Sequence, residues 1–205
     1  MLGFKTKSAA DRAAFEAQVS PWLDTLYASA VRLTRNDRNA EDLVQDTVMR
    51  AWRFFDKFEQ GTNFRAWLFK ILTNTFINSY RRTTREKSLQ DESERQSVEA
   101  QFFSSDVTDR AQNPEDYLLD RVMSEDVLKA IDGLPIDFRM VVILADVQEF
   151  TYREIADILD VPVGTVMSRL FRGRKQLQKT LLARENTETS PLIDLNAFRE
   201  RKKLG

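Results

Sequence analysis

The stretch from Gly164 to Leu177, GTVMSRLFRGRKQL, combines basic and apolar residues at helical spacing and contains no acid. Its four bases are Arg169, Arg172, Arg174 and Lys175. Guanidinium and ammonium groups donate hydrogen bonds to phosphate oxygens and to guanine edges. A solvated helix face usually carries both signs of charge, whereas residues 161–184 include six bases and no acid. The pattern therefore favours contact with DNA over a solvated basic face.

The chain of 205 residues contains neither histidine nor cysteine. Those absences remove disulfides, thiol nucleophiles, the commonest metal ligands and the usual proton shuttle. The six glycines are too scattered along the chain to form a phosphate-binding loop. We therefore expect no enzyme activity, no cofactor and no metal site.

Hydrophobic residues make up 42% of the chain and charged residues 31%, which suits a soluble protein with a packed core. No run of about 18 apolar residues is present, so we expect no membrane insertion. The N-terminal sequence MLGFKTKSAADRAAF lacks the apolar stretch of a signal peptide. These features predict a cytoplasmic protein.

A helix-turn-helix is predicted to position the basic stretch. The segment TYREIADILDV begins with Thr151 and Glu154, which are spaced as a capping box at a helix start. Pro162 and Gly164 then interrupt the helical pattern, and a second helix is expected to begin near Thr165. Two short helices joined by a tight turn, the second one basic, are typical of DNA-binding proteins.

The spacing of apolar residues divides this second helix into two faces. The predicted core face comprises Val166, Leu170, Gly173, Leu177 and Leu181. The predicted outer face comprises Thr165, Ser168, Arg169, Arg172 and Lys175. Gly173 has no side chain and would allow a neighbouring helix to approach closely. An outer face of this kind enters the major groove of DNA, where arginine reaches guanine edges or phosphates.

An amphipathic helix is predicted over NDRNAEDLVQDTVMRAWRFFDKF, residues 36–58. Its apolar stripe comprises Leu43, Val44, Thr47, Val48, Ala51, Trp52 and Phe55. Its polar side comprises Glu41, Asp42, Gln45, Asp46, Met49, Arg50 and Arg53. Acids in the first turns also stabilise the helix dipole, so a purely structural role explains part of this pattern.

A second helix of the N-terminal half, predicted over residues 64–82, carries more aromatic rings than one core stripe needs. The stripe comprises Phe64, Trp67, Leu68, Ile71, Leu72 and Thr75, and the additional rings are Phe69, Phe76 and Tyr80. Bases and amides are interleaved with them at Arg65, Lys70, Asn74, Asn78, Arg81 and Arg82. Rings that alternate with bases suit unpaired nucleic-acid bases and a phosphate backbone. A large aromatic core with a charged rim fits the pattern equally well.

The pattern is helical throughout, which predicts an all-α protein with two small domains joined by a flexible acidic linker. The first domain is expected over 9–85, the linker over 86–116, the helix-turn-helix domain over 117–183 and a disordered tail over 184–205. Residues 90–126 contain eleven acids and three bases, a net charge of −8. Their low apolar content predicts mobility, because they cannot bury enough surface to become ordered.

Three phrases, in this order, resemble the extracytoplasmic-function (ECF) group of bacterial sigma factors in the sigma-70 family. They are NAEDLVQDTVMRAWRFFDKF, NFRAWLFKILTNTFINSYRR and LPIDFRMVVILADVQEFTYREIADILDVPVGTVMSRLFRGRKQL. The resemblance covers most of residues 20–182. It implies an alternative sigma factor that directs core RNA polymerase to specific promoters and initiates transcription. The implied partners are core RNA polymerase, through its clamp coiled coil and flap, promoter DNA, and an anti-sigma factor.

The resemblance implies a role for each polar surface. The candidates for polymerase binding are Glu41, Asp42, Gln45, Asp46, Met49 and Arg50. The candidates for recognition and melting of the minus-ten element are Asn63, Phe64, Asn74, Asn78, Arg81 and Arg82. The candidates for reading the minus-thirty-five element are Thr165, Met167, Ser168, Arg169, Phe171, Arg172 and Lys175. Some members of the family carry a base-contacting arginine where this chain has Met167.

Two alternatives remain open. A stand-alone helix-turn-helix regulator would share the C-terminal pattern but would leave the polar surface of residues 41–53 and the acidic linker unexplained. An RNA-binding protein would rest on the aromatic and basic helix alone. The linker itself is either a soluble spacer or an acidic segment that occupies a basic channel of the polymerase.

Overall fold

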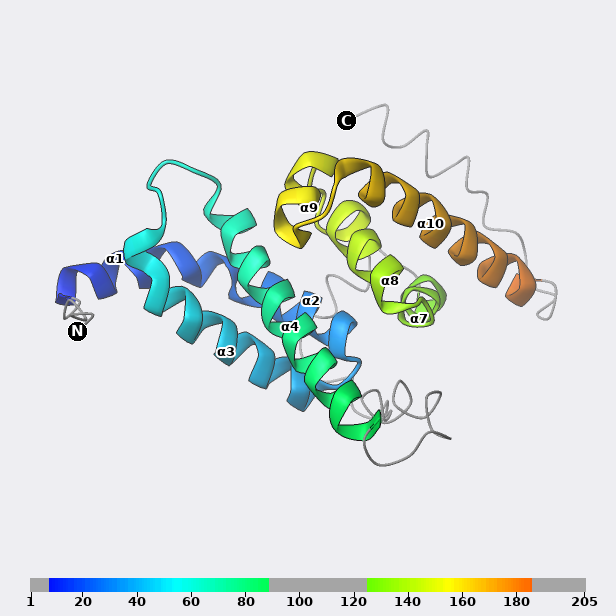
Figure 1. Cartoon of the computed structure of the whole chain (residues 1–205), viewed down its shortest axis with the longest axis horizontal. Helices are drawn as coiled ribbons and strands as arrows, with labels where there is room; N and C mark the ends of the chain where they lie inside the picture. The colour runs from blue at the N-terminus through cyan, green and yellow to red at the C-terminus, as the bar shows by residue number, and fades with distance from the viewer. Residues whose placement is uncertain (1–7, 89–124, 186–205) are drawn as a thin grey trace.

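The computed structural model describes residues 8–88 and 125–185, and these residues form helices without any strand. The N-terminal half contains α1 (Ala9–Val19), η1 (Ser20–Trp22), α2 (Leu23–Thr34), α3 (Asp37–Phe54), η2 (Phe55–Lys57) and α4 (Phe64–Ser88). The C-terminal half contains α7 (Glu125–Asp132), α8 (Ile136–Val142), the π-helical turn η3 (Ile143–Val147), α9 (Tyr152–Leu159) and α10 (Val163–Glu185). The predicted all-α fold is confirmed (Figure 1).

Two helices continue beyond the last residue predicted for them. Helix α4 continues to Ser88, three residues into the predicted linker, and α10 continues to Glu185. The sequence TREKS at the end of α4 contains no helix breaker, so the helix extends beyond the last apolar residue. The rest of the predicted linker, residues 117–124 of the predicted second domain and the tail beyond residue 185 lie outside the described residues.

The N-terminal half is a helical bundle in which α2, α3 and α4 pack together. Helix α2 ends at Arg35, whose φ of 56° is left-handed, and the Asn36 side chain then accepts a hydrogen bond of 2.9 Å from the Asn39 amide. This side-chain cap starts α3 in a new direction. At the far end of the bundle, the Phe58 and Phe64 ring centroids lie 5.0 Å apart, so the loop between α3 and α4 is anchored at both ends.

The C-terminal half is built around α8 and η3, which are apolar on nearly every side. Helix α9 begins with the predicted capping box, because the Thr151 hydroxyl accepts from the Glu154 amide and the Glu154 carboxylate accepts from the Thr151 amide. Helix α10 begins at Val163, two residues earlier than predicted, since the Pro162 carbonyl already accepts from the Thr165 and Val166 amides. Gly173 lies directly against α8, as its spacing predicts.

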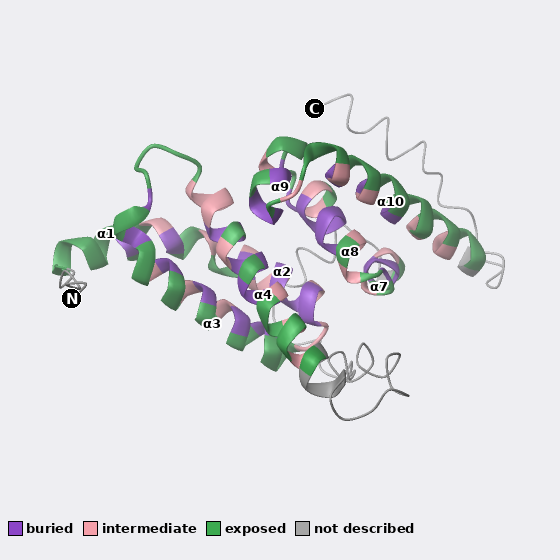
Figure 2. Cartoon of the chain, in the orientation of Figure 1, coloured by how far each residue is buried: buried purple, intermediate pink, exposed green. Residues whose placement is uncertain are grey.

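The two halves pack against each other, which the sequence analysis did not predict. Helix α4 lies between the rest of the N-terminal bundle and α9, as Figure 1 shows. The buried apolar residues of both halves form one continuous cluster, and Figure 2 shows their buried faces turned inward. The Phe69 ring of α4 meets the Phe150 ring before α9 at a centroid distance of 5.1 Å.

A polar network at the centre of this contact joins α4, η3 and α2. Arg65 donates hydrogen bonds to the Gln148 backbone carbonyl at 2.6 Å and to the Gln148 side-chain oxygen at 2.8 Å. The Gln148 side-chain nitrogen donates to the Ser29 hydroxyl at 3.1 Å. Gln148 is only 5% exposed, so its polar atoms depend on these partners rather than on water.

A second polar contact joins the turn before α8 to the end of α2. Arg139 is 1% exposed and donates to the Leu33 carbonyl at 3.2 Å and to the Leu134 carbonyl at 2.7 Å. Beside it, Arg32 and Asp132 form an ion pair of 3.7 Å. Carbonyls at the end of α2 have no partner within the helix, so a guanidinium from the other half satisfies one of them.

Replacing Gln148 with alanine should loosen the contact between the halves. The change removes the side-chain partner of Arg65 and the donor to Ser29, so the free energy of unfolding should fall by about 1.5–3 kcal/mol, as for a hydrogen bond to a charged group. Chemical denaturation measures this loss, and small-angle X-ray scattering should show a larger radius of gyration. Gln176→Ala, at an exposed site on α10, is the control. Identical values for both variants would contradict the role of Gln148.

Gly173 offers a test of the packing inside the C-terminal half. A Cβ atom there would lie 3.0 Å from Cγ2 of buried Val142 and 3.3 Å from Cβ of Phe138. Overpacking costs about 1–3 kcal/mol, which exceeds the gain of about 1 kcal/mol from replacing glycine in a helix. Gly173→Ala should therefore lower the melting temperature. Gly164→Ala, with no atom within 4 Å of its Cβ, should not, and adding Val142→Ala should reduce the penalty in a double-mutant cycle.

Candidate nucleic-acid interface

Helices α9 and α10 form the predicted helix-turn-helix. Helix α9 ends at Asp160, whose φ of 53° is left-handed, and the Val161 amide donates back to the Ala156 carbonyl at 3.1 Å. This turn reverses the chain within a few residues and directs α10 across α9. Val166 and Leu170 are buried beneath α10, so the opposite side of its first half faces outward.

The outer face of α10 carries the predicted minus-thirty-five candidates. Met167, Ser168, Phe171, Arg172 and Lys175 are exposed, whereas Thr165 and Arg169 are half-buried. Figure 2 shows this exposed strip along the side of α10 that faces away from α8. The helix therefore brings these residues together on one surface, as the spacing predicts.

Acids from neighbouring elements neutralise part of the basic charge of α10. Asp137 at the start of α8 forms an ion pair of 3.3 Å with Arg169. Asp146 in η3 binds Arg174 through both carboxylate oxygens, one of them at 3.1 Å from Nε, and this contact raises the pKa of Arg174. Among the described residues, Arg172 and Lys175 have no such partner. The charge that α10 presents to solvent is thus smaller than its sequence indicates.

The minus-ten candidates lie at two places on α4. Asn74, Asn78, Arg81 and Arg82 are exposed from the middle of α4 onward, while Phe64 is half-buried in the aromatic cluster. Asn63 precedes the helix, and its side-chain oxygen accepts from the Ala66 amide at 3.0 Å. The structure therefore separates Asn63 and Phe64 from the other four candidates by two or more turns of helix.

Asn63 also contacts the helix-turn-helix directly. Its side-chain nitrogen donates to a Glu154 carboxylate oxygen at 2.7 Å, and that residue belongs to the capping box of α9. The hydrogen bonds from Thr151 lower the pKa of Glu154, and the bond from Asn63 acts in the same direction. In this arrangement one candidate DNA contact of the N-terminal half is occupied by the C-terminal half.

The additional aromatic rings of α4 belong mainly to the core. Phe69 and Phe76 are almost fully buried, and Tyr80 is half-buried and stacks on Phe76 at a centroid distance of 6.2 Å. Of the two interpretations left open by the sequence, the aromatic core is correct for Phe69 and Phe76. These two rings are not available to stack on nucleic-acid bases, which removes the main support for an RNA-binding helix.

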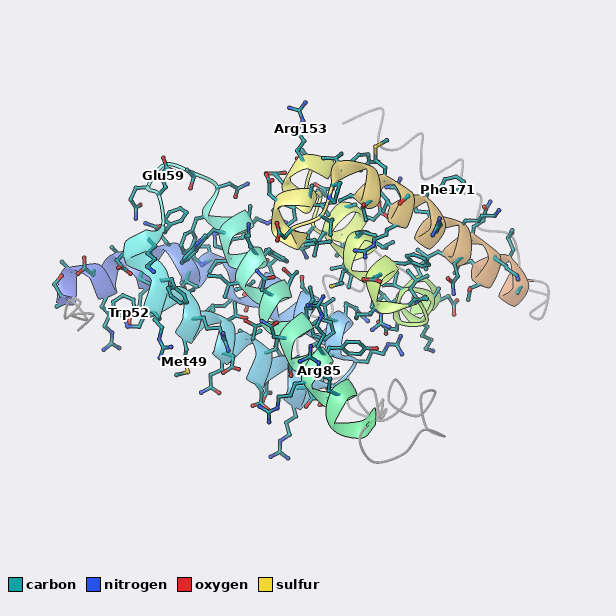
Figure 3. The ribbon with its side chains drawn as sticks, in the orientation of Figure 1. Met49, Trp52, Glu59, Arg85, Arg153 and Phe171 are labelled. Carbon is teal, nitrogen blue, oxygen red and sulfur yellow. The ribbon has the colours of Figure 1, made fainter. Side chains whose placement is uncertain are left out.

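The polymerase-binding candidates form one exposed side of α3. Glu41, Asp42, Gln45, Asp46, Met49 and Arg50 are all exposed. Figure 3 shows Met49 on the side of α3 that points away from α4, and α9 and α10 lie beyond α4 in the same view. This surface therefore stays accessible while the two halves are in contact.

Sequence reasoning missed the residues that join the halves. Gln148 and Arg139 were not singled out, and Arg65 was named only as one of the bases between the aromatic rings. An arginine inside the apolar run DFRMVVIL is a signal of a specific buried partner. The searched residues contain no cluster of three potential metal ligands. Within 8–88 and 125–185, no helix is long and apolar enough to cross a membrane.

Comparison with known proteins assigns both halves. Residues 19–86 match the model of sigma-70 region 2, and residues 124–177 match that of sigma-70 region 4. The chain is 37% identical over 169 residues to the ECF RNA polymerase sigma factor SigE of Mycolicibacterium smegmatis, covering 82% of this chain and 61% of that protein. It is 32% identical to SigW of Bacillus subtilis, covering 83% of this chain and 90% of that protein.

A solved structure shares the fold of both halves. The sigma factor RpoE of Bartonella quintana, crystallised with the anti-sigma factor NepR, superposes with a TM-score of 0.61 at 31% identity. The match covers 82% of this chain and 96% of that chain. The resemblance seen in the sequence is confirmed, and the matched stretch spans less than two thirds of the Mycolicibacterium protein.

The ion pair between Asp137 and Arg169 predicts a gain of DNA binding on removal of the acid. In Asp137→Asn, Arg169 would be released to contact a phosphate, so the salt dependence of duplex binding should steepen by up to about 0.9 in log–log slope. Fluorescence anisotropy across a salt series measures the slope. Asp157→Asn removes the same charge from an exposed site on α9 and serves as the control. Equal slopes in the two variants would show that the pair does not restrain Arg169.

Proposed function

Because the chain belongs to the ECF group of the sigma-70 family, we propose that it acts as an alternative sigma factor of bacterial RNA polymerase. The observation that carries this proposal is the presence of both family regions in one chain, in order, each with an exposed polar surface of its own. In this proposal the chain supplies promoter recognition and strand opening, and the core polymerase supplies catalysis.

The proposal assigns one partner to each surface. The exposed side of α3 binds the clamp coiled coil of core polymerase. Helix α4, with the loop that precedes it, captures and melts the minus-ten element, and α10 reads the minus-thirty-five element. The corresponding domains span 9–85 and 117–183, joined by the linker over 86–116. An anti-sigma factor is a further proposed partner, supported by the complex in which the similar Bartonella structure was solved.

In this proposal, the two halves are in contact only while the protein is not bound to promoter DNA. The two promoter elements are centred about 25 base pairs apart, which corresponds to about 85 Å at 3.4 Å per base pair. Helix α4, with 25 residues, is about 38 Å long and α10, with 23 residues, is about 35 Å long. Helix α9 lies against both of them, so the two candidate surfaces are closer together than the two promoter elements. Both elements cannot be contacted in this arrangement, so the halves separate when the promoter binds.

A stand-alone helix-turn-helix regulator is the second candidate, and one experiment separates the two. The purified chain is mixed with core RNA polymerase and DNA from upstream of its own gene, and run-off transcripts are measured. A sigma factor yields a transcript that depends on the chain and co-sediments with the core enzyme. A regulator binds the DNA but gives neither result, and that outcome would reject the proposal.

Asn74 tests the assignment of α4 to strand opening. It is exposed near the middle of the helix. Asn74→Ala should leave assembly with core polymerase unchanged and should lower open-complex formation, measured as permanganate reactivity of thymines near the start site. Asn39→Ala, an exposed asparagine on α3, is the matched control. Promoter opening at the wild-type rate by Asn74→Ala would remove this residue from the minus-ten candidates.

A further inference from the structure

The outer face of α10 carries large apolar side chains that phosphate binding does not explain. Met167 is 53% exposed and Phe171, one helical turn later, is 70% exposed. Tyr152 of α9 is also exposed, and Figure 3 shows Phe171 pointing away from the ribbon of α10. Scattered exposed apolar residues are common, but neighbours on the reading face of a DNA-binding helix indicate a specific contact.

These side chains line a depression on the surface of α9 and α10. Its volume is about 690 Å³, and it is lined by Tyr152, Met167, Leu170, Phe171, Arg174, Lys175 and Gln178. The lining of this depression therefore combines apolar side chains with basic ones. Duplex DNA offers the matching combination, because its phosphates lie beside base edges in the major groove.

The ion pairs of α10 determine which side chains are left to read the bases. Arg169 is held by Asp137 and Arg174 by Asp146, so both guanidinium groups already have carboxylate partners. The exposed side chains that remain on the first half of the outer face are Met167, Ser168, Phe171 and Arg172. The Ser168 hydroxyl donates to the Thr165 carbonyl at 3.0 Å, so Met167 and Phe171 are the large groups beside Arg172. Both are apolar, and the C5-methyl group of thymine is the only apolar group that the bases present in the major groove.

We propose that Met167 and Phe171 select thymine in the minus-thirty-five element by packing against its C5-methyl group. Four residues of helix rise about 6 Å, so the two side chains reach different thymines. Arg172 and Lys175, beside them, donate to phosphates or to a neighbouring guanine. The inference rests on the proposed function, and it names the base that α10 recognises.

Deoxyuridine provides a direct test because it differs from thymidine only in lacking that methyl group. A duplex is first selected from a random-sequence pool by the full-length chain, without polymerase. Each thymine is then replaced in turn by deoxyuridine, and the affinity is measured by fluorescence anisotropy. Two replacements should weaken binding about fourfold each, the effect of exposing one buried methyl group.

The variants identify which side chain contacts each methyl group. Phe171→Ala should abolish the deoxyuridine penalty at one position and Met167→Ala at the other. Leu182→Ala, an exposed apolar residue near the end of α10, should keep both penalties. The proposal would be overturned if deoxyuridine still weakened the binding of the two test variants, or if it weakened binding at no thymine. Failure of the pool to yield any enriched sequence would overturn it as well.

Two further outcomes separate this inference from its alternatives. The first alternative is that a polymerase segment or another protein occupies the depression. Met167→Ala and Phe171→Ala would then lose co-sedimentation with core polymerase while their affinity for duplex DNA stays unchanged. That result would also overturn the proposal that these residues select thymine. Failure of the proposed function appears separately, as absence of chain-dependent transcription from the wild-type protein. Methyl-dependent binding without transcription would support the inference and leave the stand-alone regulator as the function.

Discussion

The polar network at the centre of the contact between the two halves depends on one partly buried charge, the guanidinium of Arg65. Removing a charge from water is costly unless hydrogen bonds replace the lost hydration, and burial lowers the pKa of this group. Gln148 supplies two acceptors, and the Phe150 ring lies 4.4 Å from the guanidinium carbon. The Trp22 and Phe69 rings lie within 5.7 Å and extend this cation–π environment. Once the halves part, water can replace these hydrogen bonds, which suits the separation that the proposed function requires.

The contact conceals little of the proposed binding surface. It occupies the start of α4, where Asn63 is hydrogen-bonded to Glu154, and leaves Asn74 and the later residues of that helix exposed. The polar side of α3 and the outer face of α10 are exposed as well. Under the proposed function, core polymerase can therefore engage α3 before the halves part. Under the same proposal, the occluded candidate is Asn63 in the loop before α4, so the contact would delay promoter melting rather than assembly with the enzyme.

Much of the fold could be predicted because its signals are local. Periodicity located the helices, the Thr151 and Glu154 spacing gave the start of α9, and the spacing of Gly173 indicated a close helix contact. The packing of the halves could not be predicted in this way. Arg65 and Gln148 are 83 residues apart, and an amphipathic pattern shows which face is buried without showing what covers it. The aromatic surplus of α4 was ambiguous for the same reason, because Phe69 is covered by Phe150 from the other half.

The charge of α10 could not be predicted from its own sequence either, because residues from other elements pair with it. A count along α10 finds bases without acids, yet Asp137 and Asp146 reach its arginines from α8 and η3. These pairs are partly exposed to solvent, so each contributes little to the stability of the fold. Their effect is to hold Arg169 and Arg174 in defined positions beside the reading face, where a phosphate could replace the carboxylate. Under the proposed function, positive charge then fixes where α10 sits on the duplex, and the uncharged side chains of the same face contribute to the discrimination between base pairs.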